Sequence, residues 1–263
     1  MNPTTNKHIA LVLGSGGARG LAHIGAIEAL EERGYTITSI AGCSMGSIIA
    51  GMYAAGQLKE AKEWFLRVDK QLILRMMDIN LLSGNGLVKG QRIIEELQTI
   101  VPDRPMEQLN IPCTIVASDI MSTEEVVFRT GSLFEAVRAS ISIPLFFEPV
   151  HIGKYVLIDG GILNPLPLHV VERTEGDLLV AMDISGKDSI AIDHKLNFLS
   201  ILDRISDMQI QQNTLLSLRI TPPDIHAVMR QYAYNTFDFD KAEQIIADGK
   251  KIMNEALDRY EKV

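Results

Sequence analysis

A serine, Ser44, stands between Gly42 and Gly46 in a spacing typical of a nucleophile on a tight turn between a strand and a helix. Residues 36–41 read as a short strand before it, and residues 47–55 read as a helix of small and apolar residues after it. Side chains at the flanking positions would clash in so tight a turn, which accounts for the two glycines. The pattern predicts that Ser44 attacks a carbonyl carbon in front of the helix N-terminus.

A glycine-rich loop, GSGGARG at residues 14–20, follows an apolar run at residues 8–13 that predicts a strand buried on both faces. Consecutive glycines let main-chain N–H groups approach a negative oxygen without a Cβ in the way. A serine that attacks a carbonyl needs such donors nearby, so we interpret the loop as an oxyanion hole. The alternative is nucleotide binding. It is disfavoured because Arg19 replaces the third glycine of the dinucleotide motif and the loop has no phosphate-binding lysine.

An acidic residue, Asp159, ends a predicted strand at residues 155–158 and is followed by Gly160 and Gly161. A carboxylate at the end of a strand stands where a catalytic acid or base belongs. The other interpretation is an aspartate that turns a hairpin together with a glycine, which is a common arrangement.

The predicted elements that position these residues follow a simple order. Over the first fifty residues they are a strand, the glycine-rich loop, a helix, a second strand, the tight turn at Ser44 and a second helix. This order predicts a parallel β–α–β unit whose functional turns lie on one edge of the sheet, and hence an α/β fold. Further strands are expected at residues 113–117, 125–129, 155–158 and 178–183, and further helices at 58–68, 91–101, 133–138, 196–218 and 240–260.

The chain shows no repeat, low-complexity tract or composition shift that would mark a domain boundary. We expect a flexible tail at residues 1–7 and one domain at 8–263, with a helical insertion at 58–110 and C-terminal helices at 195–263. Within the insertion, the Met- and Leu-rich residues 72–87 surround a glycine turn. They are interpreted either as ordinary core or as a mobile apolar lid.

The composition limits the classes of partner. The chain has 263 residues, of which 33 are acidic and 25 basic, and its formal net charge is −8. Such a chain lacks the basic face that nucleic acid requires and should not adhere strongly to anionic membranes, so lipid contact has to come from apolar side chains. Two cysteines, Cys43 and Cys113, are too few for a disulfide framework.

Targeting and metal-binding signals are not evident. The apolar run at residues 9–13 is too short for a secretory signal, and five glycines interrupt the uncharged stretch at 34–58. We therefore expect no transmembrane segment and a cytoplasmic location. The sequence offers no compact cluster of metal-ligand residues such as H-E-x-x-H, so neither a metal nor a cofactor is expected.

Together, the three stretches resemble the motifs of the patatin-like phospholipases, specifically the small bacterial members. The loop at residues 14–20 resembles their oxyanion loop, residues 42–46 their G-x-S-x-G elbow, and residues 159–161 their D-G-[GA] motif. Residues 140–144 and 237–241 also resemble segments of the bacterial branch, and the resemblance extends from about Lys7 to Ala256. Ser15 departs from the version of the loop that carries a run of glycines.

The resemblance implies a three-layer α/β/α sandwich with a central, mostly parallel sheet. It also implies a serine lipid acyl hydrolase with a Ser–Asp dyad, which cleaves fatty-acyl esters through an acyl-enzyme. By match, Ser44 is the nucleophile, Asp159 is the base, and Gly16 and Gly17 supply the oxyanion donors. Arg19 either holds the loop or meets a phosphate head group. The other residues that match the motifs are Gly14, Gly20, Gly42, Gly46, Gly160 and Gly161.

The sequence leaves alternatives open for the function and for the substrate. A non-catalytic module that binds or senses lipid is the alternative function. The ester substrate, taken free or at a membrane surface, is left as a phospholipid, a lysophospholipid, an acylglycerol or a simpler ester.

Three histidines follow Asp159 in the chain, so the Ser–acid–His order of an ordinary triad is present by counting. His169 is expected in a helix opened by the NPLP sequence at residues 164–167. His194 lies in a charged stretch, and His226 is expected in a connection after two prolines. Since none is expected at the end of a buried strand, the sequence favours the dyad over a triad.

Overall fold

The computed structural model describes residues 7–69, 72, 88–188 and 197–262. Two segments lie outside the described residues. They are the predicted tail at residues 1–7, apart from Lys7, and the segment at 72–87 interpreted as core or as a lid, apart from Leu72.

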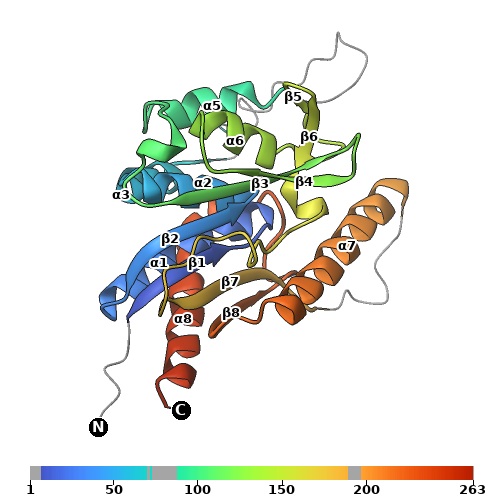
Figure 1. Ribbon diagram of the computed structural model, residues 1–263. Coiled ribbons are helices and arrows are strands. Elements are labelled where there is room, and N and C mark those ends of the chain that lie inside the picture. Colours follow the sequence, from blue (N-terminus) through green and yellow to red (C-terminus); the bar gives the residue numbers. More distant parts are fainter. Residues whose placement is uncertain (1–6, 70–71, 73–87, 189–196, 263) are drawn as a thin grey trace.

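A central sheet of eight strands has the order β5-β6-β3-β2-β1-β7-β8, with β4 paired to β3 (Figure 1). Strands β1, β2, β3, β7 and β8 pair in parallel, whereas β4, β5 and β6 join in antiparallel fashion. The central parallel strands are apolar and buried, as expected for strands covered on both faces. The strands are β1 His8–Leu13, β2 Thr36–Cys43, β3 Cys113–Asp119, β4 Glu124–Phe128, β5 Val150–Ile152, β6 Tyr155–Asp159, β7 Leu178–Gly186 and β8 Ile225–Arg230.

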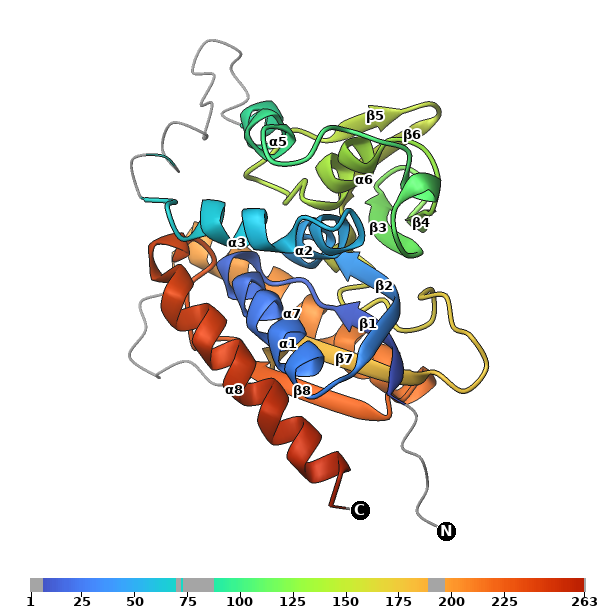
Figure 2. The same cartoon turned by 90° about the vertical axis from the view of Figure 1, so that its left-hand side faces the viewer.

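Helices cover both faces of this sheet, which confirms the three-layer α/β/α arrangement. Helices α1, α2, α6 and α8 share the main core on one face, and α7 packs with the segment at residues 166–171 on the other. Figure 2 shows α1 and α8 in front of the sheet and α7 behind it. The helices are α1 Ala22–Glu32, α2 Met45–Ala54, α3 Leu58–Phe65, α5 Gln91–Gln98, α6 Leu133–Ser140, α7 Phe198–Ile220 and α8 Ala242–Tyr260.

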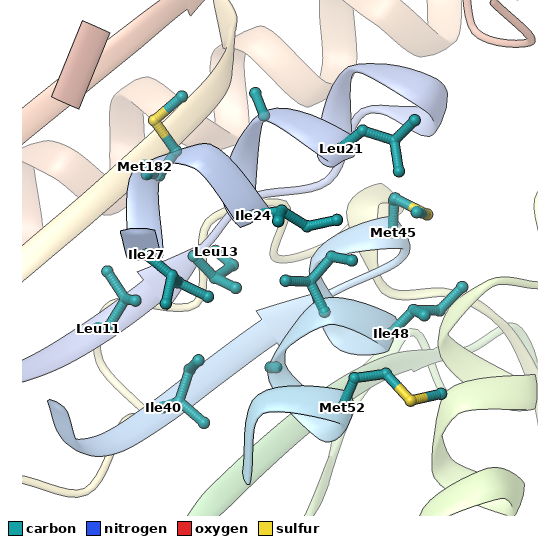
Figure 3. Packing of buried hydrophobic residues seen from close by; sticks show 14 of the residues in the cluster. Leu11, Leu13, Leu21, Ile24, Ile27, Ile40, Met45, Ile48, Met52 and Met182 are labelled. Carbon is teal, nitrogen blue, oxygen red and sulfur yellow. The ribbon is translucent and has the colours of Figure 1, made fainter. Parts of the chain in front are cut away.

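The main core supports the turns that end β1 and β2. Side chains of these strands and of β7 meet the inner faces of α1 and α2, and burial of each large side chain contributes about 1.5–3 kcal/mol. Because the glycine-rich loop and the serine turn follow β1 and β2 directly, this packing fixes both of them. Figure 3 shows the contact, with labels on Leu11, Leu13, Leu21, Ile24, Ile27, Ile40, Met45, Ile48, Met52 and Met182.

Helices α1 and α8 touch through their main chains. A Cβ at Gly25 would lie 1.9 Å from the carbonyl oxygen of Ile246, and a Cβ at Gly249 would lie 2.1 Å from that of Ala22. Only glycine permits so close an approach at either position. Since α1 continues directly from the 3₁₀ turn Gly17–Leu21, α8 supports the helix that carries the glycine-rich loop.

Two predictions about local structure are wrong. The NPLP sequence at residues 164–167 opens no helix: the segment runs over the sheet in turns, which bury Leu166, Leu168 and Val171 against it. His169 therefore lies in a turn. His226 lies within β8 and not in a connection, since the alternating burial of Ile225–Arg230 suits an edge strand.

Candidate active site

Ser44 and Asp159 come together because two strands end against each other on one edge of β3. β2 runs parallel to β3 and pairs with it as far as Cys43, opposite Val116. β6 runs antiparallel along the continuation of the same edge and ends with Asp159 opposite Ala117. The carboxyl ends of the two strands therefore face each other, and Ser44 is the first residue beyond β2.

The turn at Ser44 is strained and tightly packed. Ser44 has φ 53° and ψ −123°, a conformation that residues other than glycine rarely adopt and that clusters at functional sites. A Cβ at Gly42 would lie 2.2 Å from the carbonyl oxygen of Gly46. A Cβ at Gly46 would lie 2.3 Å from that of Leu13 at the end of β1. Only glycine fits at these two positions, which leaves Ser44 as the side chain that the turn presents.

The hydroxyl of Ser44 donates a hydrogen bond of 2.6 Å to Oδ2 of Asp159. The other carboxylate oxygen, Oδ1, accepts a bond of 2.7 Å from the main-chain N–H of Gly161. Burial raises the pKa of Asp159 to about 6, although the bonds from Ser44 and Gly161 act in the opposite direction. A buried carboxylate with this pKa is a stronger base than an exposed one and suits proton transfer near neutral pH.

The glycine-rich loop presents unused donors beside Ser44. The N–H groups of Gly16 and Gly17 have no acceptor within the described part of the chain, and Gly17 lines the same cavity as Ser44. Gly17 has φ +58°, and a Cβ there would lie 2.7 Å from the carbonyl oxygen of Thr236, so glycine is required. The loop is anchored on both sides by bonds from the N–H groups of Gly14, Ser15 and Ala18 to the carbonyls of Met182, Pro165 and Thr236.

Arg19 is buried and directed into the protein. Its Nε donates to the carbonyl of Ile184 at 3.1 Å, and its Nη1 donates to the carbonyl of Tyr234 at 2.9 Å. These bonds connect the glycine-rich loop to β7 and to the segment before α8. The geometry therefore favours the first of the two expected roles, in which Arg19 holds the loop.

Three further motif glycines stand where a side chain would collide with a neighbouring segment of the site. A Cβ at Gly20 would lie 2.5 Å from Cβ of Met45, and a Cβ at Gly160 would lie 2.4 Å from the carbonyl oxygen of Val116. At Gly161 a Cβ would come within 2.7 Å of the hydroxyl of Ser15. Side chains at these positions would push the loop, the elbow and the Asp159 turn apart.

Residues 140–142, to which the sequence analysis assigned no role, connect Ser44 to Asp159. The main-chain N–H of Ser44 donates to Oγ of Ser140 at 2.9 Å, and that of Asp159 donates to the carbonyl of Ser142 at 2.9 Å. Ser142 is held in turn by the buried guanidinium of Arg138, at 2.6 Å. The only sequence signal was the resemblance of residues 140–144 to a bacterial family segment.

His23 was also missed. It is fully buried in α1, and its Nε2 lies 2.8 Å from the carbonyl oxygen of Gly14. Burial lowers the pKa of His23 to about 4, so the ring is neutral and donates from Nε2 to this acceptor. A polar residue within the apolar periodicity of residues 21–30 was the available signal.

An apolar cavity of about 100 Å³ opens from Ser44. Its walls come from α2, α3, α5, the segment after α6 and the segment before α8, and nearly all of the lining side chains are aliphatic or aromatic. Such a surface suits a hydrocarbon chain better than a polar ligand. The lining residues are Gly17, Ser44, Met45, Ile48, Trp64, Phe65, Val68, Ile93, Leu97, Ile141, Ile143, Phe147, Thr236, Phe237 and Phe239.

The histidines after Asp159 make other contacts. Nε2 of His169 lies 3.2 Å from a carboxylate oxygen of Glu125, and Nε2 of His226 lies 3.4 Å from one of Asp183. His194 lies outside the described residues. Among residues 7–69, 72, 88–188 and 197–262, no group of three or more His, Cys, Asp or Glu side chains could hold a metal ion.

Comparisons with known proteins point to one family. A sequence model of the patatin-like phospholipase family matches residues 11–171. An uncharacterized NTE family protein of Mycobacterium tuberculosis is 42% identical over 186 residues, which are 71% of this chain and 51% of that protein. Human patatin-like phospholipase domain-containing protein 6 is 32% identical over 191 residues, covering 70% of this chain and 14% of that protein. The match thus spans about half the length of this mycobacterial relative and a much smaller share of the human one.

Two solved structures share the fold. VipD from Legionella pneumophila aligns with a TM-score of 0.50 and 16% identity, over 97% of this chain and 67% of that one. The ExoU–SpcU complex of Pseudomonas aeruginosa aligns with a TM-score of 0.50 and 17% identity, over 98% of this chain and 52% of that one. At these identities the likeness concerns the fold alone. No helix in the described ranges is long and apolar enough to cross a bilayer.

Proposed function

The chain belongs to the patatin-like phospholipase family, and on that premise we propose that it is a serine lipid acyl hydrolase with a Ser–Asp dyad. The observation that carries the proposal is the 2.6 Å hydrogen bond from Ser44 Oγ to Asp159 Oδ2, made at the end of an apolar cavity. The bond supplies an activated nucleophile, and the cavity supplies a place for a fatty-acyl chain.

In the first half of the reaction, Ser44 transfers its proton to Asp159 as its oxygen attacks the carbonyl carbon of the ester. The oxyanion that forms is stabilised by the N–H groups of Gly16 and Gly17 and by the N-terminus of α2. One such donor is worth roughly 10²–10³-fold in rate, or about 2.7–4 kcal/mol. Protonated Asp159 then gives the proton to the leaving alkoxide, and an acyl-enzyme remains on Ser44.

In the second half, water attacks the acyl-enzyme while Asp159 accepts one of its protons. The second oxyanion uses the same donors, and its collapse releases the fatty acid and returns the proton to Ser44. Every proton transfer in the cycle involves Asp159, whose raised pKa suits both acceptance and donation. Neither a metal ion nor an organic cofactor takes part in the proposed steps.

A serine-directed fluorophosphonate tests the proposal. We expect it to label the wild-type chain, with the added mass on Ser44, and to leave Ser44→Ala unlabelled. Labelling that persists in Ser44→Ala, or that falls on Ser15, would contradict the assignment. A chain that neither reacts with the probe nor hydrolyses any short-chain ester would instead be a non-catalytic lipid-binding module.

Three further assignments belong to the same proposal. We place the catalytic unit in a single domain at residues 8–263, locate the chain in the cytoplasm, and take fatty-acyl esters of lipids as the substrate class. Limited proteolysis, cell fractionation and analysis of the products released from a lipid extract test them in turn.

A further inference from the structure

Leu145 stands at the apex of a turn and points an apolar side chain at solvent. The main-chain N–H groups of Phe146 and Phe147 both donate to the carbonyl of Ile143, at 3.2 and 2.9 Å, and these bonds close the turn. Leu145 has φ +72°, a left-handed conformation that a bulky side chain adopts only with strain. The residue is nevertheless 58% exposed, so packing against the described residues leaves more than half of this leucine open to solvent.

The same turn forms part of the wall of the active-site cavity. Ile143 and Phe147, on either side of Leu145, line the cavity together with Ser44. The ring of Phe146 lies 5.2 Å from that of Phe237, centroid to centroid. An aromatic contact thus joins the turn to the segment on the other side of the cavity.

Phe237 shows where the cavity wall reaches the surface. It lines the cavity and is also 37% exposed. Exposed Leu145 thus directly precedes Phe146, whose ring contacts Phe237, and Phe237 belongs to the wall of the cavity at Ser44. Exposed apolar groups that continue into an apolar cavity are typical of an interaction site and not of isolated surface residues.

We propose that Leu145 and Phe237 form a docking surface for the interface of an electroneutral lipid aggregate, so that the substrate enters the cavity without first crossing water. The inference rests on the proposed function, because a fatty-acyl chain is the ligand that the cavity fits. The net charge of −8 opposes an anionic surface and leaves burial of apolar side chains as the driving force. A zwitterionic phosphatidylcholine vesicle is therefore the matched probe.

Replacement of Leu145 by asparagine separates docking from folding. Asparagine tolerates the left-handed conformation, so Leu145→Asn removes the apolar group while relieving strain, and the melting temperature should stay the same or rise. Vesicle binding is measured by co-sedimentation in the Ser44→Ala background, which keeps the lipid intact. We expect Leu145→Asn to weaken binding to phosphatidylcholine vesicles by about tenfold, the effect of withdrawing one leucine from the interface.

The matched control is Met121→Asn, which also replaces an exposed apolar side chain by asparagine, at a residue that is 74% exposed and lies outside the cavity wall. It should bind vesicles as well as its parent. With Ser44 intact, Leu145→Asn should hydrolyse a short soluble ester within about twofold of wild type. Its hydrolysis of vesicle lipid should fall with the binding, because Leu145 does not line the cavity.

Several outcomes would overturn the docking surface. They are equal binding by Leu145→Asn and its parent, equal weakening by Met121→Asn, and binding that requires anionic lipid and disappears at high salt. A change of oligomeric state in Leu145→Asn would assign the turn to a second copy of the chain. Failure of the wild type to cleave any ester, with vesicle binding retained and weakened by Leu145→Asn, would refute the proposed function and leave docking in place.

Discussion

Ser140, the last residue of α6, accepts a hydrogen bond of 2.9 Å from the main-chain N–H of Ser44. The two residues are 96 positions apart in the chain, and both are buried. The bond holds the main chain of Ser44 at its strained φ of 53°. A second bond, from the main-chain N–H of Asp159 to the carbonyl of Ser142, holds Asp159 from the same segment. The spacing of Ser44 and Asp159 therefore depends on the residues that end α6.

Ser140→Ala should lower turnover of a short soluble ester by about tenfold and destabilise the chain by about 1–3 kcal/mol, because a buried N–H is left unsatisfied. The check is kcat and KM together with the melting temperature, and the loss should lie in kcat. The control is Ser132→Ala, which removes the N-cap of the same helix and costs about 1 kcal/mol. If Ser132→Ala lost as much turnover for the same loss of stability, Ser140 would have no positioning role.

Asp159→Asn should lower kcat by roughly 10²–10⁴-fold, because no group remains that accepts the proton of Ser44. Ser44→Ala should cost about as much, since members of one catalytic unit are not additive. His169→Gln and His226→Gln should each keep most activity, as should His194→Gln. The measurement is hydrolysis of a soluble ester by folded protein. One histidine variant that abolished turnover at unchanged melting temperature would show a triad instead.

The rate should depend on pH through Asp159. Its carboxylate accepts a proton only when ionised, and its pKa is about 6. We therefore expect kcat/KM to be high near neutral pH and to fall as the pH drops through about 6. The profile is measured on a soluble ester between roughly pH 4.5 and 8, with the melting temperature followed in parallel. A rate that stays level down to pH 4.5 would exclude Asp159 as the base.

The free energy of unfolding should depend on the ionisation of Asp159 in the opposite direction to the rate, and fall as the pH rises. The folded pKa of Asp159 lies above the unfolded value, so its contribution to stability is fully present below about pH 4 and is lost as the pH rises through about 6. Near pH 7 the ionised carboxylate costs the fold about 3 kcal/mol.

Asp159→Asn should therefore raise the melting temperature at pH 7 by about 5 °C, and the gain should shrink towards pH 5. The amide oxygen still accepts from the N–H of Gly161, and the amide nitrogen can donate to Ser44, so the contacts survive. Differential scanning calorimetry at the two pH values gives the result. A gain that was the same at both pH values would show that ionisation of Asp159 is not its source.

Arg19→Lys tests whether this residue holds the loop or meets a head group. Lysine keeps the charge but cannot donate to both the carbonyl of Ile184 and that of Tyr234 from a planar fork. We expect turnover of an uncharged soluble ester and of a phospholipid to fall together, by about tenfold or more. Arg67→Lys, at an exposed position, is the control and should change neither rate. A loss confined to the phospholipid would assign Arg19 to the head group.

The parts of the site that were predictable from sequence are those set by local backbone geometry. Gly42 and Gly46 reveal the elbow because a main chain passes within 2.2–2.3 Å of where each Cβ would be, whatever the rest of the fold does. The parallel β–α–β unit and the three-layer class followed in the same way from apolar runs and glycine turns. The family resemblance, confirmed by the comparisons, supplied the identity of the partner acid.

The parts that sequence reasoning missed depend on contacts between distant segments. No periodicity indicates that β2 and β6 share one edge of β3 from opposite directions, because strand pairing is decided by register and not by composition. The prolines at residues 164–167 satisfied the rule for a helix start, yet the segment packs on the sheet as turns. His226 read as part of a loop because an edge strand alternates in burial and carries little apolar signal.

Helices α1 and α8 touch through Gly25 and Gly249, and this contact connects α8 to the proposed active site. The family match ends at residue 171, whereas α8 begins at Ala242. The main chain of α8 nevertheless lies against α1 at Gly25, a few residues beyond the glycine-rich loop. A helix outside the region matched by the family model thus supports the loop to which we assign the oxyanion donors. We therefore expect a substitution at Gly249 to change the rate of hydrolysis although Ser44 and Asp159 are unaltered.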